Sequence, residues 1–215
     1  MQTITYGDLA AFVKQCSLLM KENKDYLIAL DASMGDGDLG LTMTAGFAAA
    51  ERFMEDNREA DLGKVWMKLG MTFAEAVPST MGTLLASGFL AAGKKAKGKT
   101  EFTAADLAAF WLDFAGGIME RGKAKSGERT IVDSILPAAR ALEAAAVKGL
   151  PIEACCETAF EAAQAGLEAS RQMLPVFGRA VYYGEKVLGQ PDPGAVVGML
   201  LYKALFQTAN VYTEI

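Results

Sequence analysis

The chain of 215 residues contains no histidine. This absence excludes imidazole as a general base, histidine as a metal ligand, and a phosphohistidine intermediate carried on this chain. A reaction step that needs any of these would have to be carried out by a partner protein.

Cysteine is also scarce, with only Cys16, Cys155 and Cys156 in the whole chain. All three fall on apolar faces of segments with helical spacing, and Cys155 and Cys156 are neighbours rather than a C-x-x-C pair. We therefore expect buried thiols rather than metal ligands or nucleophiles.

The sequence lacks a basic face, because its net charge is −5 and its isoelectric point is near 4.9. Nucleic acids and anionic membranes are therefore poor candidates for partners. An anionic ligand would need a metal ion to bind here.

No long hydrophobic run is present, and nothing approaches the roughly 20 apolar residues of a membrane span. The first residues, MQTITYGDLAAF, lack a basic region followed by an apolar core. We expect a soluble, cytoplasmic protein.

Sustained period-two alternation is absent, whereas apolar residues recur at helical spacing in nearly every segment. This pattern predicts one all-α domain over residues 1–215, a barrel or bundle of about eight antiparallel amphipathic helices. The apolar stripes of these helices cover Leu9–Met20, Met43–Met54, Leu62–Phe73, 80–95, Leu107–Ile118, Val132–Leu142, Ile152–Leu167 and Val197–Leu205.

The most informative segment is LDASMGDGDLG, residues 30–40, which lies between two predicted helices. Glycines alternate with Asp36 and Asp38 and permit positive φ, so both side chains can turn toward one point, while Asp31 arrives from the preceding helix end. Two charges about 4 Å apart repel by roughly 4 kcal/mol at an effective dielectric constant near 20. Such a cluster should hold a proton or a cation, and carboxylate oxygens suit Mg²⁺ or Ca²⁺.

An EF-hand begins with similar spacing but does not fit this segment. The twelfth position, which should be a bidentate Glu, is Phe47 when counted from Asp36 and Thr42 when counted from Asp31. The structural alternative is an Asx-rich turn that ends one helix and caps the next.

Two polar connections are further candidates for ligand contacts. Residues 121–130 precede the predicted helix over Val132–Leu142, whose first backbone amides could meet an anion. Residues 174–192 form a long connection without a helical stripe, in which Arg179 offers a planar group for phosphate. It ends in Asp192-Pro193-Gly194, where Asp192 can be an N-cap and Pro193 the first residue of a helix.

Residues 93–100, GKKAKGKT, match the P-loop pattern G-x-x-x-x-G-K-[ST]. A P-loop follows a buried β-branched strand, whereas the preceding LLASGFLAA is small and helix-like. We therefore interpret this segment as a solvated connection between helices.

Taken in order, four markers resemble the L subunit, or nucleotide-binding domain, of dihydroxyacetone kinases, and the resemblance spans essentially the whole chain. These markers are residues 30–41, the GERTIVD segment at 127–133, Gly178-Arg179-Ala180 and Asp192-Pro193-Gly194. The family implies a barrel of eight antiparallel helices with a nucleotide, ADP or ATP, and two Mg²⁺ ions at one end.

The resemblance also implies roles for individual residues. The metal ligands would be Asp31, Asp36 and Asp38. The residues expected to approach the nucleotide are Leu39, Gly40, Leu41, Thr42, Thr80, Met81, Gly122, Ile131, Arg179, Asp192, Pro193 and Gly194.

In that family the ketone substrate is held by a histidine of a separate K subunit, which agrees with a chain that has no histidine. In members that depend on the phosphotransferase system, ADP stays bound and is recharged by a phosphohistidine M subunit. In ATP-dependent members the nucleotide exchanges. The resemblance thus implies a K-type partner and leaves open an M-type phosphocarrier.

The chain departs from the family pattern at three places. The usual Asp-His-Gly is Asp38-Leu39-Gly40, the Gly-Gly-Ala-Ser type segment is replaced at residues 81–85 by MGTLL, and residues 180–183 are AVYY instead of serine-rich. These changes leave open another small ketose, such as a four-carbon one, or another phosphoryl donor.

Three functions therefore remain to be separated. The leading hypothesis is a kinase subunit that binds Mg-nucleotide and transfers a phosphoryl group to dihydroxyacetone or a related ketose on its partner. The alternatives are a regulatory module that reports nucleotide state to a partner protein and, least favoured, a P-loop NTPase that depends on Lys99.

Overall fold

The computed structural model describes residues 2–210, and these residues form nine α-helices and one 3₁₀-helix, η1. The only β-type pairing within residues 2–210 is an isolated bridge between Ile4 and Phe102. The elements are α1 (Tyr6–Glu22), α2 (Lys24–Ala32), α3 (Leu39–Asp56), α4 (Leu62–Ala76), α5 (Thr80–Lys95), α6 (Ala104–Gly122), α7 (Val132–Val147), α8 (Ile152–Ser170), η1 (Arg179–Val187) and α9 (Pro193–Asn210).

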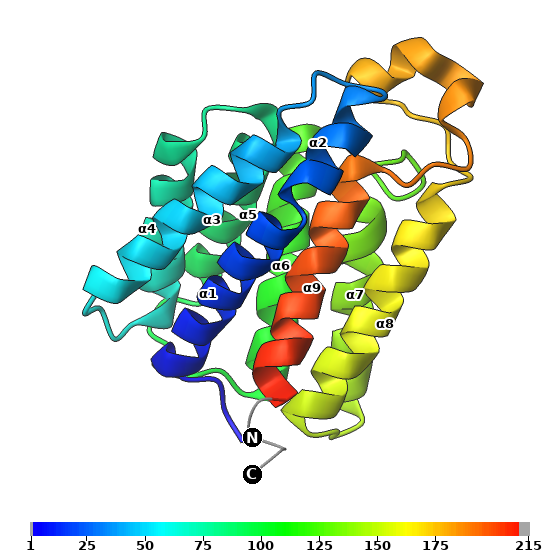
Figure 1. Ribbon diagram of the computed structural model, residues 1–215. Coiled ribbons are helices and arrows are strands. Elements are labelled where there is room, and N and C mark those ends of the chain that lie inside the picture. The colour runs from blue at the N-terminus through cyan, green and yellow to red at the C-terminus, as the bar shows by residue number, and fades with distance from the viewer. Residues whose placement is uncertain (1, 211–215) are drawn as a thin grey trace.

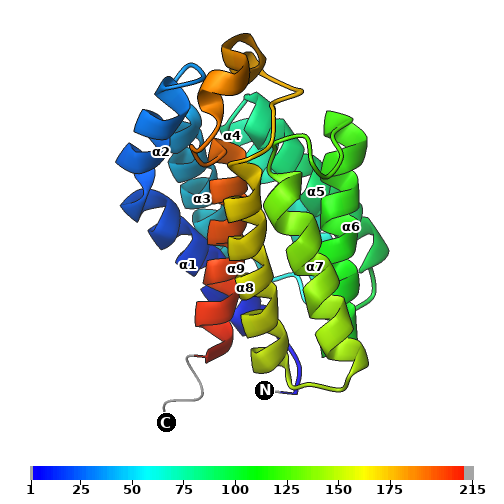
Figure 2. The same cartoon turned by 90° about the vertical axis from the view of Figure 1, so that its right-hand side faces the viewer.

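Eight long helices form a closed ring in which each packs against the next. Contacts run from α1 to α3 and then in order through α9, which packs back against α1. Neighbouring helices alternate in direction, as Figures 1 and 2 show. The predicted all-α architecture of about eight antiparallel helices is confirmed. The predicted single domain also includes residues 1 and 211–215, which lie outside the described residues.

The short helix α2 is additional to the ring and was not visible in the apolar periodicity. It is separated from α1 by Asn23, whose backbone leaves helical geometry at φ −98° and ψ 9° and whose side chain donates to the carbonyl of Leu19 at 2.8 Å. The break turns the chain across the end of the ring (Figure 1). As a result, the C-terminal end of α2 delivers Asp31 to that end.

Aromatic side chains fill much of the interior. The ring centroids of Trp66 and Phe110 are 4.4 Å apart, and those of Trp111 and Tyr202 are 4.6 Å apart. The three cysteines are free and buried, as predicted. This apolar interior leaves the ends of the ring as the places where polar chemistry can be built.

None of the described helices is both long and apolar enough to cross a membrane.

Side-chain caps fix several helix starts at the positions expected from the sequence. Thr103 and Asp106 form a capping box at the start of α6. Asp192 accepts a hydrogen bond from the backbone N–H of Ala195 at 2.8 Å, and Pro193 is the first residue of α9. The predicted N-cap and first helical residue of this last helix are therefore confirmed.

The P-loop-like segment 93–100 lies at the other end of the ring from α2. It begins inside α5, and a Cβ on Gly93 would lie 2.7 Å from the carbonyl oxygen of Gly63, so this glycine permits close packing of α5 on α4. The N–H of Gly98 donates to Asp61, and Lys99 pairs with Asp106 at 2.9 Å. These contacts confirm that the segment is a connection between helices.

Burial raises the pKa of Asp192 from 3.8 to about 7, and the nearby charge of Arg129 opposes the rise only in part. A carboxyl group whose pKa is higher in the folded state lowers the stability of the protein as it ionises. Asn preserves the N-cap without the charge. The stability of Asp192→Asn relative to wild type should therefore increase from pH 4 to pH 7, by at most about 1.4 kcal/mol per pH unit.

Urea unfolding at several pH values measures this difference. Asp61→Asn is a control of opposite sign, because the hydrogen bonds from the N–H groups of Gly98 and Lys64 to Asp61 outweigh its desolvation and lower its pKa. This variant should lose stability relative to wild type as the pH rises. A difference for Asp192→Asn that stays constant with pH would contradict the account.

Candidate nucleotide and metal site

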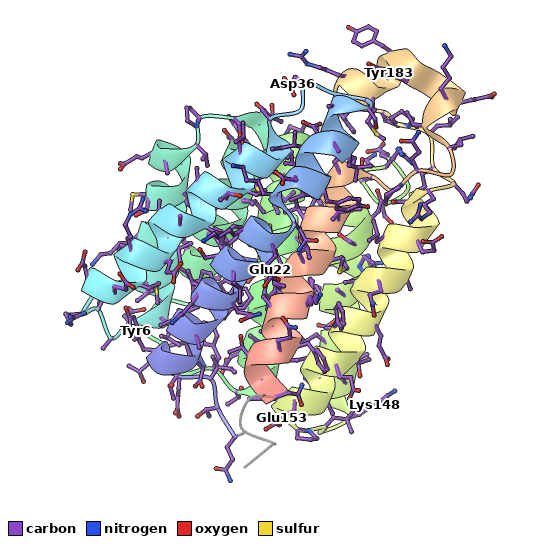
Figure 3. The ribbon with its side chains drawn as sticks, in the orientation of Figure 1. Tyr6, Glu22, Asp36, Lys148, Glu153 and Tyr183 are labelled. Atoms are coloured by element: carbon purple, nitrogen blue, oxygen red, sulfur yellow. The ribbon has the colours of Figure 1, made fainter. Side chains whose placement is uncertain are left out.

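The residues singled out from the sequence lie at one end of the ring. This end carries the α2–α3 loop, the starts of α5, α7 and α9, the end of α6, and the segment 171–191 that contains η1 (Figure 1). Figure 3 shows Asp36 and Tyr183 at this end, and Lys148 and Glu153 at the opposite one. The alternation of helix direction therefore gathers segments that are far apart in the sequence.

Asp31, Asp36 and Asp38 form a compact cluster of carboxylates. Each offers an oxygen atom, and these three atoms all lie within 4.8 Å of one another. Asp31 is partly buried at the end of α2, whereas Asp36 and Asp38 are exposed in the loop before α3. The cluster is thus open to solvent on one side.

Two glycines shape the loop around the cluster. Gly37 has φ of +74°, a left-handed conformation that other residues rarely adopt. A Cβ on Gly35 would collide with the carboxylate of Asp31. The backbone N–H of Leu39, the first residue of α3, donates to Asp31 at 3.3 Å. The glycines predicted to turn the loop are therefore needed for its shape.

The electrostatics of the cluster favour a positive ligand. Desolvation and the charges of Asp36 and Asp31 raise the pKa of Asp38, and the charge of Arg179 opposes this rise. The raised pKa means that adjacent carboxylates oppose full ionisation of the cluster. A bound cation would relieve that repulsion, and three carboxylate oxygens form a donor set that fits Mg²⁺ or Ca²⁺.

Arg179 lies beside the same cluster. It is exposed, and its Nη2 atom lies 2.9 Å from Oδ2 of Asp36. The structure thus brings the arginine of the long connection to the carboxylates of the α2–α3 loop. Because a planar guanidinium binds phosphate as readily as carboxylate, this side chain can serve either group.

The long connection, which shows no helical stripe in the sequence, contains one short 3₁₀-helix. Residues 179–187 form the 3₁₀-helix η1, interrupted at Gly184, which has φ of +54°. Only Val187 of this helix is buried, so the segment has no continuous apolar stripe that would reveal a helix. We refer to residues 171–191 as the cap.

A second group of predicted residues meets beside the start of α9. A Cβ on Gly194 would lie 3.0 Å from Oδ2 of Asp192, 3.1 Å from the backbone nitrogen of Ile131 and 3.2 Å from Cε of Met81. Met81, Ile131, Asp192 and Gly194 are therefore neighbours, although they come from α5, α7 and α9. Pro193 is buried next to them.

The remaining predicted residues differ in what they can offer a ligand. The side chain of Leu39 packs in the core, and Gly40 lies against α2, where a Cβ would collide with the carbonyl of Lys24. Thr42 is buried, whereas Leu41 and Thr80 are exposed and Gly122 is half-buried at the end of α6. The side chain of Leu39 therefore contributes to packing in this structure.

Two backbone amides in the connection at residues 121–130 bind a carboxylate of the chain itself. Asp133, in the first turn of α7, accepts hydrogen bonds from the N–H groups of Gly127 and Thr130. Asp133 is buried, so this contact fixes the loop internally. The predicted contact of an anion with the first backbone amides of α7 stays a prediction.

Sequence reasoning also missed a buried arginine at this end. Arg129 is 2% exposed, and its guanidinium donates to backbone carbonyls on both sides of the cap. An arginine in a polar connection is normally a solvated side chain, so this burial could not be predicted from the local sequence. Its contacts with Met34, Val187 and Gln190 place it next to both the loop of the carboxylate cluster and the cap.

Comparison with known proteins agrees with this geometry. The family model described as the DAK2 domain matches residues 33–207. The ADP-binding subunit DhaL of the PEP-dependent dihydroxyacetone kinase of Escherichia coli is 28% identical over 97% of this chain and 99% of its own length. A corresponding DhaL subunit of Listeria innocua is 30% identical over 88% of each chain.

Solved structures show the same fold. The dihydroxyacetone kinase of C. freundii superposes with a TM-score of 0.73 at 26% identity, over 93% of this chain and 34% of that longer one. The same kinase in complex with AMP-PNP and Mg²⁺ gives a TM-score of 0.73 at 27% identity, over 92% of this chain and 33% of that one. With a family model that covers most of its length and relatives that align nearly end to end, the chain belongs to the DAK2 domain family, as a dihydroxyacetone kinase L subunit.

Proposed function

We propose that this chain is the Mg-nucleotide-binding subunit of a cytoplasmic ketose kinase that phosphorylates dihydroxyacetone or a related small ketose held by a separate K-type subunit. The observation that carries the proposal is the cluster of Asp31, Asp36 and Asp38 with Arg179 beside it. Relatives named as ADP-binding subunits, and a relative solved with AMP-PNP and Mg²⁺, support the ligand.

In this proposal the three carboxylates hold two Mg²⁺ ions against the phosphates of ADP or ATP. Bound Mg²⁺ supplies charge neutralisation and alignment of the phosphoryl group for in-line transfer. Arg179 reaches from the cap to the phosphates, and the exposed Leu41 and Thr80, with Met81, Gly122, Ile131 and the turn at 192–194, line the nucleotide.

The acceptor side of the reaction is assigned to a partner. A chain without histidine cannot hold the ketone through an imidazole, and we identify no general base among the residues gathered at this end. We therefore place the ketose and the group that accepts its hydroxyl proton on the K-type subunit. Recharging of bound ADP by an M-type phosphocarrier is the version suggested by the PEP-dependent relatives.

The first prediction concerns the carboxylates. Replacing Asp31, Asp36 and Asp38 together with Asn should lower the Mg²⁺-dependent affinity for ADP at least 100-fold in isothermal titration, because the cation loses its charged ligands. Without metal, the variant should be at least as stable as wild type, since the repulsion between carboxylates is removed.

Lys99→Ala is the control, because this variant removes the lysine of the P-loop-like segment at the opposite end of the ring. It should leave ADP affinity unchanged within a factor of two. Unchanged Mg²⁺-dependent binding in the triple Asn variant would rule out the proposed site, and loss of binding in Lys99→Ala would favour the P-loop alternative.

The second prediction concerns Arg179, which faces Asp36 at 2.9 Å. Because its guanidinium competes with a cation for this carboxylate, Arg179→Ala should tighten the binding of Mn²⁺ alone about two- to five-fold, the range expected for an exposed ion pair. The same variant should weaken Mg-ADP binding about tenfold or more, since a charged bond to phosphate is lost.

Opposite signs for metal alone and for metal with nucleotide separate this role from general damage to the fold. Lys186→Ala removes a charge from the same cap and should change both affinities by less than a factor of two. Equal weakening of both ligands by Arg179→Ala would show that the arginine only stabilises the loop.

The third prediction concerns the surface that meets the partner. The cap carries exposed apolar side chains, among which Tyr182 is 91% exposed, and they lie at the end where the phosphoryl group must leave. The full set in the cap is Leu174, Val176, Phe177, Val181, Tyr182, Tyr183 and Leu188. We expect this surface to dock on the K-type subunit.

Tyr182→Ser should therefore weaken the complex with the purified K-type subunit of the same organism at least fivefold in surface plasmon resonance, while Mg-ADP affinity stays unchanged. Val147→Ser is a matched control, because Val147 is 82% exposed at the end of α7, away from the cap. Equal effects of the two variants would place the docking surface elsewhere.

A further inference from the structure

Arg129 is the most deeply buried positive charge at the ligand end of the ring. Its side chain is 2% exposed, and its backbone has φ of +56°, a left-handed conformation that is uncommon for residues with a Cβ. A strained residue of this kind persists only where its surroundings hold it firmly. The contacts of its guanidinium group indicate the role of this residue.

These contacts lie at both ends of the cap. Nη1 donates to the carbonyl of Ser170, the last residue of α8, at 2.8 Å. Nη2 donates to the carbonyls of Val187 and Gln190, where the cap returns, at 3.1 and 3.0 Å. One rigid side chain therefore ties the entry of the cap to its exit.

The same guanidinium also reaches the loop of the carboxylate cluster. Nη2 lies 3.8 Å from the sulfur of Met34, which sits between Asp31 and Asp36 in the chain. The side chains of Ser33 and Gln190 form a further contact between the loop and the cap at 3.3 Å. Arg129 thus connects the base of the cap to the loop that would hold the metal.

The ion pair between the cap and the carboxylate loop is more exposed. Arg179 and Asp36 have side chains that are 65% and 44% exposed, and ion pairs in water contribute little. The side chain of Arg171 donates to the carbonyl of Gly189 at 2.9 Å, but both residues belong to the cap itself, so this bond does not attach the cap to the ring.

The N–H of Val176 also donates to the carbonyl of Glu128 at 3.4 Å, and Val187 packs in the core. Arg129 differs from these contacts because its buried side chain bonds to both ends of the cap.

We propose that Arg129 is the positioning residue that fixes the cap over the ligand end and thereby sets how long the nucleotide stays bound. The proposal rests on the proposed function, because it takes the nucleotide to lie beneath the cap. It does not require Arg129 to touch the ligand. Loss of the guanidinium fork frees the base of the cap, and Arg179 then no longer stays beside the carboxylates.

The test uses Arg129→Met and Arg129→Lys in the full chain, with Arg140→Met, an exposed position on α7, as the control. Hydrogen exchange in the nucleotide-free protein should show at least tenfold faster exchange in residues 171–191 of Arg129→Met, with α4 and α5 unchanged. In stopped-flow displacement, a fluorescent ADP analogue bound with Mg²⁺ should leave at least tenfold faster.

Two further readouts separate positioning from a general structural role. Binding of Mn²⁺ alone should be no weaker than in wild type, because the carboxylates remain. Arg129→Lys keeps the charge but not the fork and should give intermediate exchange and dissociation rates. Should Arg129→Met fail to fold, the lysine variant decides the question by the same measurements.

Wild-type rates in the cap and for nucleotide release in both variants would overturn the proposal. Faster exchange spread evenly over all helices would also overturn it, since that result assigns Arg129 to overall stability. Absence of nucleotide binding in the wild-type protein would instead refute the proposed function. Hydrogen exchange in the nucleotide-free protein would still show whether Arg129 holds the cap in place.

Discussion

The mutual repulsion of three carboxylates at one end of a helical ring is the constraint on which the rest of this structure depends. Asp31, Asp36 and Asp38 present oxygen atoms within 4.8 Å of one another, and desolvation together with the charges of Asp36 and Asp31 raises the pKa of Asp38. The loop can hold them together because its glycines accept a left-handed backbone and a close carboxylate. A bound cation would relieve the repulsion, and the closed ring of helices supports the loop that would hold it.

Beside this cluster the cap places Arg179 and a group of exposed apolar side chains. Arg179 forms an exposed ion pair with Asp36, while the buried Arg129 holds the base of the cap by donating to backbone carbonyls. The two arginines therefore have different tasks: one lies at the surface where it can exchange partners, and the other is buried and cannot. Arg179 can therefore exchange Asp36 for another anion while Arg129 keeps the base of the cap attached.

The sequence predicted the parts of the structure that depend on local patterns. Helical periodicity predicted the ring, and the spacing of glycines and aspartates predicted the carboxylate cluster. It could not predict contacts made by single side chains across the fold. Asp133 binds the backbone amides of Gly127 and Thr130 within its own loop, and Arg129 is buried although its neighbours in sequence are polar. Helix α2 was not predicted as a separate element because only one residue, Asn23, separates it from α1.

A crystal structure of the chain with Mn²⁺ and ADP would test the central claim most directly. Anomalous scattering locates Mn²⁺ independently of the protein density. The account predicts an anomalous peak coordinated by the carboxylates of Asp31, Asp36 and Asp38, with a phosphate oxygen of ADP as a further ligand and Arg179 turned toward the phosphates. Mn²⁺ and ADP bound away from these carboxylates, for example beside residues 93–100, would contradict it.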